Sequence, residues 1–186
     1  MPDQPAGVTA ARRRAGEHGF AYSCDPVVGR LLATLAAAVP LDGRVLELGT
    51  GFGVGTAWLF HGLAGRDDVR LVTVDRVLSW RPPFEVRVGD AEALLPGLGT
   101  FDLIFADAEG GKWSGLDLTL DALRPGGVLV VDDMDPARYT DPAHVAAVGL
   151  VRDTLHTDPR LVTCELGAGS GIMIATRRRA ALRSGG

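Results

Sequence analysis

Short apolar segments alternate along the chain with longer segments whose apolar residues recur at helical spacing. The short segments are rich in Val, Ile and Leu, which is typical of strands buried on both faces of a parallel sheet. Predicted strands cover 44–48, 69–75, 84–90, 101–107 and 127–133. Predicted helices cover 26–39, 54–65, 91–98, 113–123 and 142–155. This alternation predicts a single doubly wound α/β domain with a mostly parallel, Rossmann-like sheet.

Three segments differ from this alternation. Residues 161–166 and 171–177 flank a Gly-rich link and predict an antiparallel hairpin at the C-terminal edge of the sheet. The link 76–83 is too short for a full crossover helix, so we expect a short helical turn or extended chain there. The expected division is a loose arm with room for some helix over 1–24, the domain over 25–180 and a tail over 181–186.

Length and charge fit one globular domain. The chain has 186 residues, 23 % of them charged, and a net charge of -4, which argues against a nucleic-acid partner. Only two cysteines, Cys24 and Cys164, favour a reduced cytoplasmic setting. No apolar run reaches the ~18 residues of a membrane span, and none follows the N-terminal Arg cluster as in a signal peptide. The only lysine is Lys112.

Every predicted parallel strand ends in an acidic residue or a glycine loop. The first strand runs into a loop with glycines at 49, 51, 53 and 55, and the later strands end in Asp75, Asp90, Asp107 and Asp132-Asp133. Ligands of open α/β sheets bind beyond these carboxyl ends, so we expect the residues to share one site. An aspartate after a strand is also a common helix cap, and each one alone fits that structural role equally well.

The loop after the first strand discriminates between nucleotide cofactors. No register of it matches the dinucleotide-binding G-x-G-x-x-G/A, and the chain lacks the phosphate-binding motif G-x-x-x-x-G-K-[ST]. It instead has Glu47 followed by alternate glycines, E-x-G-x-G-x-G, where backbone meets a ligand without a Cβ in the way. This pattern resembles the first motif of class I S-adenosylmethionine-dependent methyltransferases. Asp75 is placed to accept hydrogen bonds from two ribose hydroxyls, as in nucleoside binders.

The resemblance implies a binding site for S-adenosyl-L-methionine. It brings Glu47 to the cationic amino acid end of the cofactor, although a structural hydrogen bond within the strand is the alternative. The segment Gly89-Asp90-Ala91 resembles the family segment that lines the adenine. The expected cofactor-binding residues are Glu47, Gly49, Thr50, Gly51, Gly53, Asp75, Arg76, Asp90, Ala91 and Asp107.

Two later segments, FDLIFADAEGGKW and LRPGGVLVVDDM, are similar to those of the catechol and caffeoyl-CoA O-methyltransferases. In that group, side chains after the fourth and fifth strands hold a divalent metal. They fall on Asp107, Asp132 and Asp133, so the resemblance implies a Mg²⁺ site. The metal would lower the pKa of an acceptor hydroxyl and orient it toward the methyl group. Asp107 and Lys112 are the catalytic candidates, Lys112 as a base or as an electrostatic partner.

The chain departs from this group at three positions. Asp133 stands where the group has Asn, Gly55 where it often has Ser, and the catalytic Lys of the group falls on Gly110, two positions before Lys112. The expectation is a methyltransferase acting on a small molecule, most readily at a hydroxyl. Related small methyltransferases often pair, so a homodimer is one expectation.

Two other functions stay open. The Arg runs at 12–14 and 177–179 allow a nucleic-acid methyltransferase. A non-catalytic nucleoside-binding protein of the same fold would keep the cofactor site and lack the acceptor site.

Overall fold

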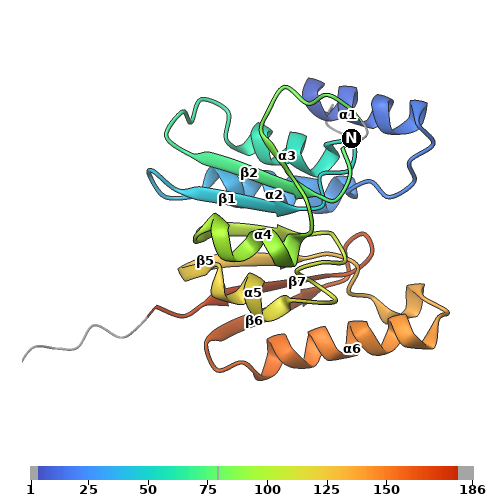
Figure 1. The fold of residues 1–186 in the computed structure, drawn as a ribbon, viewed down its shortest axis with the longest axis vertical. Coiled ribbons are helices and arrows are strands. Elements are labelled where there is room, and N and C mark those ends of the chain that lie inside the picture. Colours follow the sequence, from blue (N-terminus) through green and yellow to red (C-terminus); the bar gives the residue numbers. More distant parts are fainter. Residues whose placement is uncertain (1–3, 79, 180–186) are drawn as a thin grey trace, which may run out of the picture.

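The computed structural model describes residues 4–78 and 80–179. Its centre is a sheet in the order β3-β2-β1-β4-β5-β7-β6 (Figure 1). The first five strands run parallel, and β7 is antiparallel to both β5 and β6. The strands are β1 Arg44–Leu48, β2 Arg70–Asp75, β3 Val86–Val88, β4 Phe101–Ala106, β5 Leu123–Val131, β6 Leu161–Leu166 and β7 Ile172–Arg177. The predicted doubly wound, mostly parallel sheet with its antiparallel C-terminal hairpin is confirmed.

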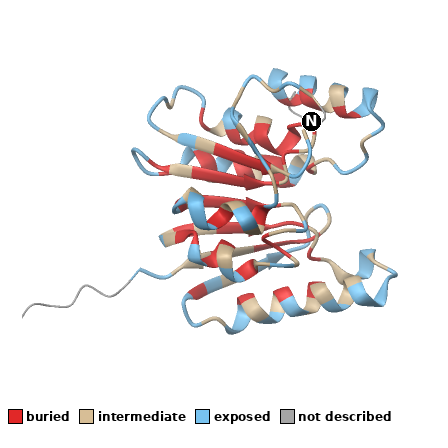
Figure 2. Ribbon diagram, viewed as in Figure 1, coloured by how far each residue is buried: buried red, intermediate tan, exposed pale blue. Residues whose placement is uncertain are grey.

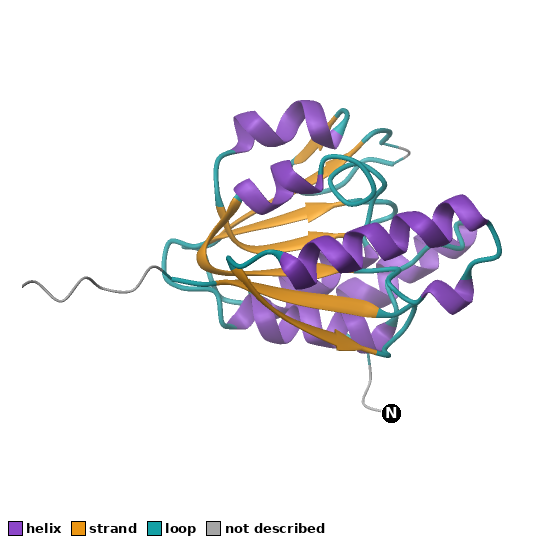
Figure 3. Ribbon diagram, turned by 90° about the horizontal axis from the view of Figure 1, so that it is seen from below, coloured by secondary structure: helices purple, strands orange, loops and turns teal. Residues whose placement is uncertain are grey.

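Helices cover both faces of the sheet (Figure 3). The first three pack on one face and the last three on the other. Asp25, Asp90 and Asp141 each cap a helix by accepting a hydrogen bond from a backbone N–H two residues on. The helices are α1 Ala6–Glu17, α2 Pro26–Ala37, α3 Val54–Gly62, α4 Ala91–Leu98, α5 Leu116–Asp121 and α6 Pro142–Thr157. Within the described ranges, none of them has the length and apolarity to cross a membrane.

The central strands are buried on both faces, as Figure 2 shows. On β4, Ile104 joins the cluster under α4, α5 and α6, while its neighbour Phe105 joins the cluster under α1, α2 and α3. This alternation is the two-residue period of a strand. Full burial of each such side chain stabilises the fold by about 1.5–3 kcal/mol, so the core holds the strand ends firmly in place.

The chain before β5 differs from the expected pattern. The predicted helix over 113–123 is reduced to the short α5, and Leu123 instead opens β5 by pairing with Phe101 of β4. The segment Pro125-Gly126-Gly127 therefore lies inside a strand rather than between helix and strand. Pairing with β4 outweighs the local turn signal of Pro and Gly.

The connection between β2 and β3 matches the short-link prediction. Residues 76–78 and 80–83, the part of this link that the structure describes, contain no helix. β3 keeps only three of the residues expected over 84–90. It lies at the edge of the sheet, where one side of the strand lacks a pairing partner.

The N-terminal arm is more ordered than expected. Residues 6–17 form the regular helix α1, which buries Val8, Ala11 and Ala15 and packs on α3. Arg14 extends from it to the glycine loop, where its Nη2 donates to the Phe52 carbonyl at 2.7 Å. The expected helical part of the arm is thus present and packed on the domain, because small apolar residues at helical spacing give α1 a face to bury. The expected tail over 181–186 lies outside the described residues.

Glu47 is a carboxylate buried beneath the glycine loop, with 1 % of its surface exposed. It accepts a hydrogen bond from Thr56 at the start of α3 and another, of 2.7 Å, from Thr73 Oγ1 on β2. Burial raises the pKa of Glu47 to about 7, and the two threonine hydrogen bonds oppose that rise. Glu47 on β1 therefore forms hydrogen bonds with both β2 and α3. This position fits a structural hydrogen-bonding role rather than a contact with the cofactor.

The raised pKa predicts a pH-dependent term in stability. The pKa of an unfolded Glu carboxyl is 4.5, so the higher folded value gives stability that is full below about pH 4.5 and lost as the pH rises through about 7. At about 1.36 kcal/mol per pKa unit, the loss is about 3 kcal/mol between about pH 4 and about pH 8.

Urea unfolding over this range measures the term directly. Between the two pH values, the unfolding free energy of Glu47→Gln should fall by about 3 kcal/mol less than that of the wild type. The matched control is Asp153→Asn, which removes an exposed carboxylate from α6. Parallel pH profiles for Glu47→Gln and the wild type would contradict the assignment.

Candidate active site

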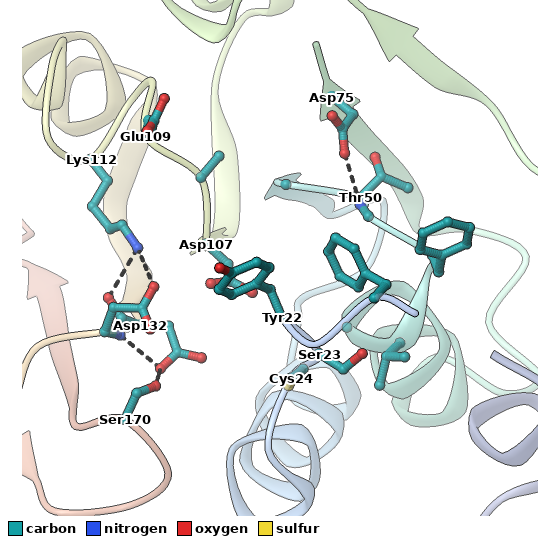
Figure 4. Close-up of a pocket in the computed structure, with 18 of the residues that line it drawn as sticks. Tyr22, Ser23, Cys24, Thr50, Asp75, Asp107, Glu109, Lys112, Asp132 and Ser170 are labelled. Atoms are coloured by element: carbon teal, nitrogen blue, oxygen red, sulfur yellow. Dashed lines mark hydrogen bonds and ion pairs between the residues drawn. The ribbon is translucent and has the colours of Figure 1, made fainter. Parts of the chain in front are cut away.

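A cavity of about 1110 Å³ lies at the carboxyl ends of the parallel strands (Figure 4). The loops that follow β1, β2, β4 and β5 line it. The segment between α1 and α2 adds Phe20, Tyr22 and Cys24. The strand order reverses between β1 and β4, which is where open α/β sheets bind their ligands.

The glycine loop after β1 lies directly against the loop after β4. Gly49 has a φ of 102°, and a Cβ on it would lie 2.4 Å from the carbonyl oxygen of Asp107. Gly51 is also left-handed, with a φ of 49°. Glycine is therefore required at position 49, and the loop presents bare backbone to the cavity as its motif predicts.

Asp75 ends β2 at one end of the cavity. Its Oδ2 accepts a hydrogen bond from Gly51 N at 2.8 Å, and its Oδ1 accepts one from Val77 N at 3.2 Å. Each carboxylate oxygen accepts more than one hydrogen bond, so Asp75 keeps capacity for the hydroxyls of a ligand. Beside it, the Arg76 guanidinium pairs with Glu109 of the β4 loop at 2.9 Å, joining two sides of the rim.

Most of the residues singled out in the sequence line the cavity. Glu47 and Gly53 do not line it. Glu47 lies beneath the loop. Gly53 faces Trp80 outside the cavity, and a Cβ on Gly53 would lie 2.9 Å from the Trp80 ring. Their expected contact with a cofactor has no support from their position. The predicted residues that do line the cavity are Gly49, Thr50, Gly51, Asp75, Arg76, Asp90, Ala91, Asp107, Lys112, Asp132 and Asp133.

The acidic end of the cavity is organised around Lys112, which is only 2 % exposed (Figure 4). Its Nζ donates to Asp133 Oδ2 at 2.9 Å and to the Asp132 carbonyl at 3.3 Å. Asp132 Oδ1 accepts from Ser170 Oγ at 2.7 Å and from Asp133 N at 2.8 Å. Asp107 lines the same region from the end of β4. The structure thus brings the three predicted aspartates to one end, with an ammonium group among them.

Burial and charge shift the pKa values of these aspartates in different directions. Burial, followed by the charge of Asp132, raises the pKa of Asp107 well above its ordinary value. Burial also raises the pKa of Asp132. Burial alone would raise the pKa of Asp133 as well. The charge and the hydrogen bond of Lys112 contribute to the opposite effect, and the pKa of Asp133 is lowered. Asp133 is therefore an ionised partner of Lys112, while Asp107 has a raised affinity for a proton.

The carboxylates do not form the expected Mg²⁺ site. A hard divalent ion needs several oxygen ligands around one point. Among the described residues, no group of three or more His, Cys, Asp and Glu side chains is arranged to hold a metal ion. Asp133 already faces the Lys112 ammonium, and Asp132 accepts from Ser170. The residues present therefore do not fit the metal site that the family resemblance implies.

Several lining residues come from segments that the sequence did not mark. Ser170 lies in the hairpin link, Tyr139 follows the 3-10 helix Pro136–Arg138, and His144 lies in the first turn of α6. The His144 ring centroid is 4.1 Å from that of Tyr139 and 5.0 Å from that of Trp113. The Gly-rich link was the only local signal, and Ser170 in it reaches the cavity because β7 lies beside β5.

Comparisons with known proteins find one family model over part of the chain and relatives along nearly all of it. Residues 46–134 match a family model described as a methyltransferase domain. A protein of Mycobacterium sp. (strain JLS) that carries an O-methyltransferase name is 31 % identical, over 94 % of this chain and 87 % of its own. A crystal structure of a cofactor-bound protein from MTB has a TM-score of 0.78 at 26 % identity, covering 97 % and 93 %. An O-methyltransferase of Streptomyces achromogenes in complex with SAM has a TM-score of 0.76 at 24 % identity, covering 95 % and 91 %.

The contact between Gly49 and Asp107 predicts a large effect of one added methyl group. Gly49→Ala adds a Cβ against backbone at a strained φ, so we expect a loss of at least about 2 kcal/mol in unfolding free energy. The control is Gly97→Ala in α4, where a Cβ meets nothing within 4 Å and should stabilise the helix by about 0.5–1 kcal/mol. Chemical denaturation of both variants checks this, and equal stabilities would refute the packing described.

Proposed function

Because this chain belongs to the O-methyltransferases, we propose that it uses S-adenosylmethionine to methylate a hydroxyl group of a small molecule. The observation that carries this proposal is the single cavity that joins the glycine loop and Asp75 at one end to Asp107 and Lys112 at the other. One end suits the cofactor and the other suits an acceptor.

The cofactor end is matched to the parts of a nucleoside. The Asp75 carboxylate accepts hydrogen bonds from the two ribose hydroxyls, as acidic residues after the second strand do in nucleoside binders. Asp90 and Ala91 also line the cavity and would contact the adenine. The bare backbone at Gly49 and Gly51 leaves room for the rest of the cofactor.

The acceptor end aligns and activates a hydroxyl. S-adenosylmethionine supplies a methyl group on a positively charged sulfur. The acceptor oxygen attacks the methyl carbon, the electrons of the C–S bond return to sulfur, and the hydroxyl proton passes to the Asp107 carboxylate. The raised pKa of Asp107 brings its basicity closer to that of the hydroxyl it serves. Lys112 holds positive charge near the developing oxyanion.

In each Arg run at least one guanidinium group is bonded within the fold, which favours a small acceptor over a nucleic acid. Arg12 donates to the Cys24 carbonyl at 2.8 Å, and Arg14 donates to Phe52 and stacks on Trp80. In the second run, Arg177 donates to the Leu123 carbonyl at 2.6 Å. These guanidinium groups are engaged in holding the fold, so they are poorly placed to contact phosphates.

The ribose role of Asp75 predicts a specific loss of cofactor affinity. Asp75→Ala removes the acceptor of two charge-assisted hydrogen bonds, so calorimetry with S-adenosylhomocysteine should show binding weakened by about 100-fold or more. Asp117→Asn, an exposed carboxylate change on α5, is the control and should bind like the wild type. Unchanged affinity in Asp75→Ala, with an unchanged melting curve, would refute the ribose role.

The reaction itself is tested with a panel of small hydroxylated compounds and isotope-labelled S-adenosylmethionine. We expect label in an O-methyl ether, detected by mass spectrometry, and loss of that product in Asp107→Asn. Tight cofactor binding without product across the panel would favour a non-catalytic binder. Label in RNA or DNA instead would favour a nucleic-acid methyltransferase.

A further inference from the structure

The acceptor end already contains a cation that belongs to the chain. Lys112 is charged, yet it is among the most completely buried large side chains of the described residues. Its ammonium is held by Asp133 and by the Asp132 carbonyl, and it lies 4.5 Å from the centroid of the Trp113 ring. Opposite charge and an aromatic face are what a buried ammonium needs in exchange for water.

The backbone around Lys112 fixes its direction. Gly111 has a φ of 83°, and its carbonyl accepts a hydrogen bond of 2.7 Å from the buried Thr119 Oγ1. A Cβ on Gly111 would lie 2.5 Å from Leu48, so the loop packs tightly on β1. The Lys112 side chain therefore reaches toward the end of β5 from a braced loop (Figure 4).

The partner carboxylates are arranged for this ammonium. Asp133 adopts a left-handed φ of 66°, which turns its side chain toward Lys112. Asp132 is held by Ser170 and by the backbone of Asp133. A divalent ion brought among these groups would lie beside a fixed positive charge, whose repulsion would oppose the attraction of the carboxylates.

We propose that the Lys112 ammonium, and not a divalent metal ion, supplies the positive charge of the acceptor end, and that the acceptor binds through a single hydroxyl oxygen. Lysine has three N–H donors, and Asp133 and Asp132 take two of them. One donor remains for one acceptor oxygen. A metal ion with open coordination positions would instead hold two neighbouring oxygens of a diol.

The surrounding rings select the rest of the acceptor. Trp113, Tyr139 and His144 form one aromatic cluster along the cavity wall beside Lys112. Planar rings stack favourably on such a wall. The acceptor class is therefore a phenol with one reacting hydroxyl, a specificity that rests on the proposed function, whereas the identity of the cation does not.

Whether the site binds a divalent ion is tested without measuring methyl transfer. The intact chain, stripped with EDTA, is titrated with Mn²⁺ while the free ion is followed by electron paramagnetic resonance. We expect no stoichiometric binding below about 1 mM, since Asp133 faces Lys112 and the carboxylates do not converge on one point. One bound ion per chain at lower concentration would overturn the proposal, whether or not the protein methylates anything.

A second test uses activity with a phenol and the matching catechol. EDTA should leave both rates unchanged, and kcat/KM for the two should agree within about threefold, because one oxygen is contacted in each. Lys112→Met should lower kcat about 100-fold, as loss of an oxyanion donor does. The control Arg70→Met removes one positive charge from the amino end of β2, away from the cavity, and should keep the wild-type rate.

These outcomes separate the proposal from the function it builds on. Loss of activity in EDTA with recovery in Mg²⁺, or a catechol strongly preferred over the phenol, would overturn the assignment of Lys112. If no acceptor is methylated, the proposed function fails, and the Mn²⁺ titration still decides which cation the site holds.

Discussion

The backbone contact between the carboxyl ends of β1 and β4 positions everything in the cavity. Asp107 N donates to the Leu48 carbonyl at 2.8 Å, and Gly49 lies against the Asp107 carbonyl with no room for a side chain. Both strands are buried on both faces, so this contact is held by the core rather than by the loops themselves. The glycine loop and Asp107 consequently share one frame, which is what an aligned displacement between cofactor and acceptor requires.

The rim of the cavity could be predicted from the sequence because parallel strands bring their ends together whatever their detailed packing. Asp75 and Asp107 follow from that rule alone. The role of Glu47 could not be settled in the same way, since its motif fits both a ligand contact and a buried hydrogen bond. Thr56 and Thr73 decide it, and they come from two other elements. Ser170 was out of reach because only the strand order brings the hairpin link beside β5.

Two departures from the related O-methyltransferases explain each other. Asp133 adds a negative charge where the group has Asn, and Lys112 places its positive charge two positions beyond the usual lysine. The two meet at 2.9 Å, so the added carboxylate is paired with the displaced ammonium. The left-handed backbone at Asp133 is one that Asp and Asn both tolerate, so the exchange costs the fold little.

The most direct measurement is a crystal structure of the chain grown with S-adenosylhomocysteine and Mn²⁺, with data collected at the manganese absorption edge. The account predicts the nucleoside against Asp75, its sulfur near Asp107, and no anomalous peak among Asp107, Asp132 and Asp133. Lys112 should still contact Asp133. A manganese peak bound by those three carboxylates, with Lys112 displaced, would contradict the account.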